Sequence, residues 1–199
     1  MAVDPDGLID DEEHEEGNAL FLDNEALHDL DSDIPLHLQD IATAAQVGDV
    51  TALRLALDNL NGNINEPVED GDTVLHLVCL YGYLPCVQLL IERGADIEAK
   101  DEDGAIPLHD ACAGGFSEIV HFLLNSADVE CVKRMLETVD SEGDTPLHHA
   151  ARGEHVDVIR MLLAAGASIK TRNFEGKKPS ELPDLHTEAK SVLESAELL

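Results

Sequence analysis

One motif recurs along the chain at a nearly constant spacing, and this regularity limits the folds open to it. Copies start at Gly71, Gly104, Gly143 and Gly176, and read GDTVLHLVCLYG, GAIPLHDACAGG, GDTPLHHAARGE and the partial GKKPSELPD. The intervals between them are 33, 39 and 33 residues. A unit of this length cannot bury its apolar face alone and must stack on its neighbours. The sequence therefore predicts a stacked array of similar units.

Each copy has the pattern of a helix, a tight turn, a second helix and a loop. In the third copy Thr145 stands where a helix is capped, and Pro146 takes the first helical position, where its missing N–H costs nothing. Gly166 ends the second helix. The apolar face of that helix consists of Val156, Ile159, Leu162 and Leu163. A degenerate helix pair of the same kind begins at Leu36, as LHLQDIATAAQVGDVTALRLALDNLNGNIN.

These units resemble ankyrin repeats over about residues 36–185. The resemblance depends on TVLH, IPLH and TPLH, on RGADIEAKDEDG and AAGASIKTRNFEG, and on the 33-residue period. It implies an all-α solenoid of four to five helix-turn-helix units with hairpin loops, whose inner helices line a concave face. Val74 and Ile106 depart from the family motif, Glu154 replaces the usual turn glycine, and the last copy lacks the histidine. Residues 186–199, beyond the array, are expected to form a capping helix.

One unit is six residues longer than the others, within LLNSADVECVKRMLETVDSEG at 123–143. It lacks the Gly-Ala-Asp sequence that starts the hairpin arm elsewhere. Its apolar residues are spaced three to four apart, and Ser126 and Asp128 are candidate caps. We predict a short amphipathic helix over 128–138 in place of one hairpin arm, with its apolar face made of Val129, Val132, Met135, Leu136 and Val139. Whether this helix binds a partner stays open at this stage.

The chain is strongly acidic. It holds 42 Asp and Glu residues against 12 Lys and Arg, for a net charge of −30. Residues 1–40 contain 14 of the acids and no Lys or Arg. Such a charge repels nucleic acid and anionic membranes and favours encounter with basic proteins, although it also serves solubility. Residues 1–35 are expected to form an acidic, largely disordered arm, of which the part after residue 20 either docks as a cap or engages a basic partner.

Several function classes find no support in the sequence. No phosphate-binding loop, GxSxG or HExxH motif occurs, so we expect neither an enzyme nor a cofactor. His76, His109 and His148 recur once per copy, but the ankyrin resemblance gives this histidine the role of tying neighbouring hairpins together, and no metal site is expected. Cys79, Cys86, Cys112 and Cys131 form no CxxC pair and are expected to be free thiols in an intracellular protein, cytoplasmic or nuclear.

The ankyrin resemblance also implies where a partner would bind. The family's variable positions, at the hairpin tips and on the concave face, correspond here to Glu69, Asp70, Asp72, Leu80, Tyr81, Glu102, Asp103, Asp110, Ala113, Ser141, Glu142, Asp144, His149 and Arg152. Most of them are acidic. We therefore expect a monomeric binding protein for a Lys/Arg-rich client, similar in size, charge and irregular middle repeat to the acidic ankyrin-repeat escorts of ribosomal proteins. The alternative is a signalling adaptor that binds through Leu80, Tyr81 and other apolar groups, with the acid serving solubility.

Overall fold

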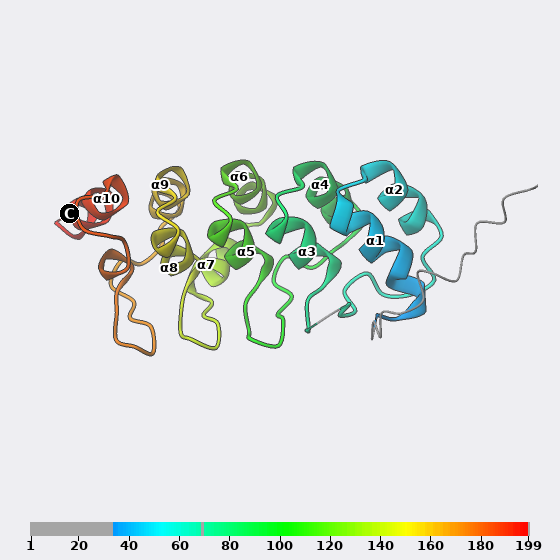
Figure 1. The fold of residues 1–199 in the computed structure, drawn as a ribbon, viewed down its shortest axis with the longest axis horizontal. Helices are drawn as coiled ribbons and strands as arrows, with labels where there is room; N and C mark the ends of the chain where they lie inside the picture. The colour runs from blue at the N-terminus through cyan, green and yellow to red at the C-terminus, as the bar shows by residue number, and fades with distance from the viewer. Residues whose placement is uncertain (1–33, 69, 199) are drawn as a thin grey trace, which may run out of the picture. The chain divides into compact units, whose positions relative to one another are not determined.

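The computed structural model describes residues 34–68 and 70–198 as helices joined by turns and long hairpin loops (Figure 1). The helices pair in sequence, and each pair is one unit of the array. The elements, in chain order, are the 3₁₀ helix η1 (Leu36–Leu38), α1 (Gln39–Val47), α2 (Val50–Asp58), α3 (Val74–Leu80), α4 (Leu84–Glu92), α5 (Pro107–Ala113), α6 (Ser117–Ser126), α7 (Val129–Glu137), α8 (Pro146–Arg152), α9 (Val156–Ala164), the 3₁₀ helix η2 (Pro179–Glu181) and α10 (Glu188–Glu197).

The pairs stack so that two rows of helices lie side by side. The first helices, α1, α3, α5 and α8, pack in one row that ends at η2. The second helices, α2, α4, α6 and α9, pack in the other row, which α10 completes. The hairpin loops all extend from the same side of the array, next to the first helices (Figure 1). This is the all-α repeat solenoid that the sequence predicts. Within the described residues no helix has the length and apolar character needed to cross a membrane.

The core between the rows is aliphatic. Its largest buried side chains are leucines and isoleucines, with one methionine, Met135. All four cysteines are free and buried among them. Since burial and nearby Asp110 raise the pKa values of Cys79 and Cys112, these thiols stay protonated and act as small apolar groups.

A ring packs on a glycine at three of the junctions between neighbouring units. Gly48, Gly82 and Gly115 end the tight turns with φ values of 69°, 79° and 71°. A Cβ at Gly82 would lie 2.5 Å from the ring of Phe116 in the next unit, and Tyr83 and His155 cover Gly48 and Gly115 in the same way. At the fourth turn Glu154 adopts φ 56°, and its carboxylate accepts a hydrogen bond from the backbone N–H of Asp184 instead. Glu154 therefore adopts the left-handed turn position itself and joins the turn to the following segment through its side chain.

Substitution of Gly82 by alanine should destabilise the array by ~2 kcal/mol, because it combines a left-handed backbone with a clash against Phe116. Gly94 is the matched control. It has φ 88° and nothing within 4 Å of its would-be Cβ, so Gly94→Ala should cost only ~1 kcal/mol of backbone strain. Urea unfolding followed by circular dichroism measures both. Equal losses for the two variants would mean that the contact between Phe116 and Gly82 adds no stability.

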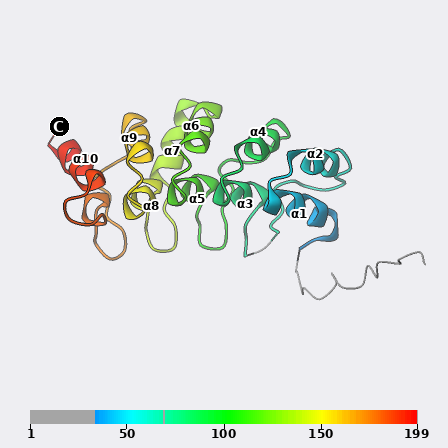
Figure 2. The ribbon, with the colours of Figure 1, turned by 45° about the horizontal axis from the view of Figure 1, so that its top comes forward.

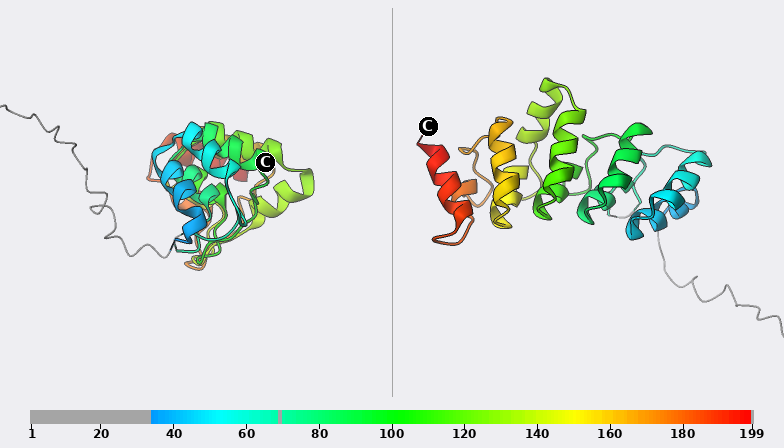
Figure 3. Two further views of the ribbon diagram at one scale, coloured as in Figure 1. Left: turned by 90° about the vertical axis from the view of Figure 1, so that its right-hand side faces the viewer. Right: turned by 90° about the horizontal axis from the view of Figure 1, so that it is seen from above.

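The predicted extra helix is present as α7, and Asp128 caps it by accepting a hydrogen bond from the N–H of Cys131 at 2.8 Å. It lies outside both rows and stands out from the side of the second helices (Figures 2 and 3). Met135 and Leu136 are buried, whereas Val129 is 82% exposed and Val139 is 37% exposed. The apolar face expected from the spacing is thus buried at its centre and exposed at both ends. Arg134 secures the helix to the preceding hairpin arm through two hydrogen bonds to Glu98, at 2.8 and 2.7 Å.

Candidate functional site

The hairpin tips and the first helices together form one surface, which we call the inner face. The tips are held side by side. The N–H of Glu102 donates to the carbonyl of Asp70 at 3.4 Å, the hydroxyl of Ser141 donates to Asp103 at 3.0 Å, and the N–H of Phe174 donates to the carbonyl of Glu142 at 2.9 Å. These bonds give the tips a fixed register along the array, so acids from different units keep constant separations.

The inner histidines set the spacing between hairpins. In each complete unit the Nδ1 atom of the histidine accepts a hydrogen bond from a backbone N–H at the helix start, at 3.1 Å for His76, 3.0 Å for His109 and 3.1 Å for His148. The proton therefore lies on Nε2, which donates to a carbonyl of the next hairpin at 3.2 to 3.3 Å. Burial lowers the pKa of all three, to about 4 for His109. Both ring nitrogens of each histidine therefore make structural hydrogen bonds that tie neighbouring hairpins together, which is the role that the family resemblance implied.

The partner-binding positions expected from the sequence fall into four groups. The exposed positions are Asp70, Leu80, Tyr81, Glu102, Asp103, Ala113, Ser141, Glu142 and Arg152. Half-buried ones are Asp72, Asp110 and His149. Asp144 is fully buried, and Glu69 lies outside the described residues.

Asp110 is the most unusual of these residues electrostatically. It lies in the first turn of α5, and its buried Oδ2 atom accepts no hydrogen bond from any described residue. Burial, together with the nearby charges of Asp72 and Asp101, raises the pKa of Asp110 to about 8. The charged form of this carboxylate is therefore destabilised, and a cation placed beside it would stabilise that charged form. We call Asp72, Asp101 and Asp110 the acid cluster.

In the next unit, the acids at the corresponding positions already have side-chain partners. His149 takes the place of Asp110 in α8, and its Nε2 lies 2.7 Å from Asp140, the counterpart of Asp101. Burial alone would raise the pKa of Asp140, but hydrogen bonds from His149 and from the N–H groups of Asp144 and Glu142 lower it. Arg152 takes the place of Ala113 and pairs with Asp144. The unit of α8 thus supplies its own hydrogen-bonding imidazole and its own cation, Arg152, where the unit of α5 has an acid and an alanine.

Asp144 differs from its expected role as a partner-binding residue. Its carboxylate is 0% exposed and is held by Arg152 and by the side-chain amide of Asn173, at 2.8 Å for the amide. A buried carboxylate that is already paired is poorly placed to receive a client's charge, and here it holds the guanidinium of Arg152 in position. Sequence reasoning in turn missed Asp101. Alignment of the hairpin tips would have found it, because Asp101, Asp140 and Asn173 each accept a bond from the backbone N–H four residues later.

Two groups of side chains come close enough to suggest a metal ion, namely Asp72 with His76 and Asp101, and Asp140 with Asp144 and His149. In the first, both nitrogens of His76 are engaged in hydrogen bonds with the backbone. In the second, the guanidinium of Arg152 already neutralises Asp144. We therefore assign neither group as a metal site.

Comparison with known proteins decides the family. The family model described as ankyrin repeats (3 copies) matches residues 41–131 and 125–173, more than half of the chain. The chain belongs to the ankyrin-repeat family. Ankyrin repeats make this chain a protein-interaction module, and both family and relatives point to a non-catalytic one.

Three relatives illustrate the range of similarity. Protein phosphatase 1 regulatory subunit 27 of Mus musculus is 37% identical over 76 residues, which are 38% of this chain and 45% of the relative. Notch-regulated ankyrin repeat-containing protein of Homo sapiens is 36% identical over 87 residues, 42% of this chain and 76% of the relative. Protein phosphatase 1 regulatory subunit 12A of Mus musculus is 36% identical over 103 residues, 50% of this chain and 10% of the relative. The chain therefore spans less than half of the phosphatase subunits that it matches.

Proposed function

We propose that this protein binds a Lys/Arg-rich polypeptide on the inner face of its ankyrin array and escorts it as a monomer in the cytosol or nucleus. The observation that carries the proposal is the unpartnered Oδ2 of Asp110 within the acid cluster. A lysine or arginine side chain of the client would supply the cation that Arg152 provides in the next unit. The exposed acids Glu102 and Asp103 at the adjacent tip add attraction for further basic residues.

Binding of this kind releases a proton. With a pKa of about 8, Asp110 is mostly protonated at neutral pH, and a neighbouring cation favours its charged form. The affinity for a basic client should therefore increase as the pH rises from about 6 to about 8. It should also decrease as salt is added, because the Debye length is already only ~10 Å at 0.1 M ionic strength.

Affinity capture from cell lysate with the full chain tests the proposal. The informative variant carries Asp101→Asn and Asp110→Asn, since asparagine retains the Oδ1 acceptor that holds the N–H of Ala105. The matched control removes two charges from the exposed faces of α4 and α6, as Glu92→Gln and Glu118→Gln. We expect a strongly basic client whose recovery falls roughly tenfold with the cluster variant and declines with salt, while the control retains it.

A different outcome would favour an adaptor. Leu80 and Tyr81 at the end of α3 are 44% and 47% exposed, and the Tyr81 ring lies 6.1 Å from the ring of Tyr83, so the inner face also offers an apolar patch. The names of the phosphatase relatives describe regulatory subunits, which is consistent with an adaptor role. If non-basic partners are recovered equally at high salt by the wild type and the cluster variant, and are lost on Leu80→Ala with Tyr81→Ala, the basic-client proposal is wrong.

A further inference from the structure

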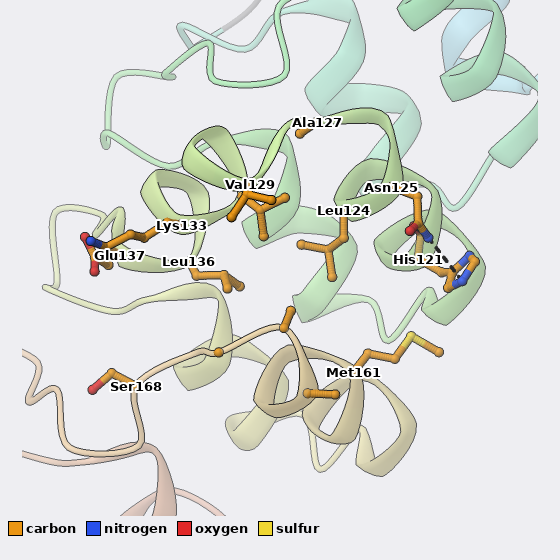
Figure 4. Close-up of a pocket in the computed structure, with 14 residues that line it drawn as sticks. His121, Leu124, Asn125, Ala127, Val129, Lys133, Leu136, Glu137, Met161 and Ser168 are labelled. Carbon is orange, nitrogen blue, oxygen red and sulfur yellow. Dashed lines mark hydrogen bonds between the residues drawn. The ribbon is translucent and has the colours of Figure 1, made fainter.

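A groove runs between α6, α7 and α9, away from the inner face, with a volume of about 870 Å³. Side chains of α6 and α7 face those of α9 across it (Figure 4). Most of its lining is apolar, and its larger apolar side chains are Leu124, Val129, Val132, Leu136 and Met161. A volume of this size is sufficient for several side chains of a bound segment.

The six-residue insertion creates this groove. After α4 and α9 the chain returns along a hairpin arm, and Ile97 or Ile169 of that arm packs against the core. After α6 the chain instead extends at Ala127 and starts α7, which stands out from the row of second helices (Figure 3). Leu124 and Met161 are left half-buried and Val129 is left 82% exposed. An apolar surface of this kind marks an interaction site when polar residues surround it.

The charge of the groove differs from that of the rest of the chain. Although the protein carries 42 acids, Glu137 is the only carboxylate among the residues that line the groove. The lining also contains one lysine, Lys133, so its formal charges sum to zero. Lys133 is exposed and makes no ion pair with any described residue. The groove is thus locally neutral, with a cation available at its edge, and is unsuited to the basic client proposed for the inner face.

We propose that this groove binds an amphipathic helix of a partner protein that presents an apolar stripe and an acidic residue opposite Lys133. The walls are themselves helices, and α7 with nine residues is ~13 Å long, enough to contact apolar residues at i, i+4 and i+7 of a bound helix. Apolar contact supplies most of the affinity, since Lys133 is exposed and screened. The carboxylate opposite Lys133 fixes the direction of the bound helix.

A pair of stapled helical peptides tests this. Both carry leucine at i, i+4 and i+7 of one face, and they differ only in a Glu or a Lys placed to reach Lys133. Methyl NMR spectra of the full-length protein report the binding site, and fluorescence anisotropy reports the affinity. We expect the Glu peptide to perturb the methyl signals of Leu124, Leu136 and Met161, and to bind at least about threefold more tightly than the Lys peptide.

Four variants separate the groove from the inner face. Val129→Glu combined with Met161→Glu should weaken the Glu peptide roughly tenfold, whereas Leu55→Glu, on an exposed leucine of α2, should leave its affinity unchanged. Lys133→Glu should reverse the preference between the two peptides. Asp101→Asn with Asp110→Asn should not alter peptide binding, so failure here is distinct from failure of the basic-client proposal. Absence of saturable shifts at the groove, or an equal loss with Leu55→Glu, would overturn the inference.

Discussion

Replacement of Asp110 by asparagine should stabilise the protein by ~3 kcal/mol at pH 8 and leave its stability almost unchanged at pH 4. The folded-state pKa of Asp110, about 8, lies above the ordinary value of an aspartate, ~3.9. The folded protein therefore holds a proton that the unfolded chain releases, and this contribution to stability is present below pH 4 and lost as the pH rises through about 8. Asparagine has no such proton to lose. The expected gain is below the full value of the shift because the site is half-buried and partly screened.

Urea unfolding of wild type and Asp110→Asn across this pH range measures the effect. Glu92→Gln serves as the control, because it removes the same charge from an exposed position at the end of α4. If the increase in unfolding free energy is independent of pH, or is shared by the control, the charged form of Asp110 is not destabilised in the folded protein. The same substitution should weaken binding of the basic client. A residue that serves binding at a cost in stability is expected to show these opposite effects on stability and affinity when it is replaced.

Truncation of His109 to alanine should destabilise the protein by ~4 kcal/mol, the largest loss that we expect from a single substitution. The imidazole is 1% exposed, and its removal leaves a cavity in the core. It also leaves the N–H of Ile106 and the carbonyl of Asp144 without the bonds that the ring makes at 3.0 and 3.3 Å. Ile106 has no hydroxyl to help cap the helix, whereas Thr73 and Thr145 also place theirs at 3.0 and 2.8 Å from the histidine of their own units. Among the described residues, His109 is thus the one side chain that caps α5.

Calorimetry and urea unfolding test this prediction together. Since His109 connects the hairpins of neighbouring units, its loss should also broaden the transition or divide it in two at that junction. His121→Ala is the control, because His121 is exposed on α6 and should cost ~0.5 kcal/mol or less. A loss below ~1 kcal/mol for His109→Ala, with an unchanged single transition, would mean that stacking of apolar faces alone holds the units together.

Much of the fold could be predicted because ankyrin units are local. The period, the PLH motif, the turn glycines and the Asp128 cap all act within a few residues of one another, and α5, α7 and α8 begin where these signals place them. The exposure of Val129 could not be predicted in the same way. Helical spacing puts Val129 on the apolar stripe of α7, but only the position of α7 outside the two rows determines which part of that stripe meets another helix.

An acidic ankyrin array with one irregular unit can be read from the amino-acid sequence, since the repeat period and the charge balance are properties of the chain alone. Which acids are available depends on the folded arrangement. Asp110 and Asp144 look equivalent as exposed acids in the motif, yet Arg152 and Asn173 neutralise and bury Asp144, while Asp110 lies against Asp72 and Asp101 with its Oδ2 unpaired. The physical reason is that a carboxylate's state depends on groups brought near it from residues 8 to 38 positions away. Only the stacking of the units sets those distances.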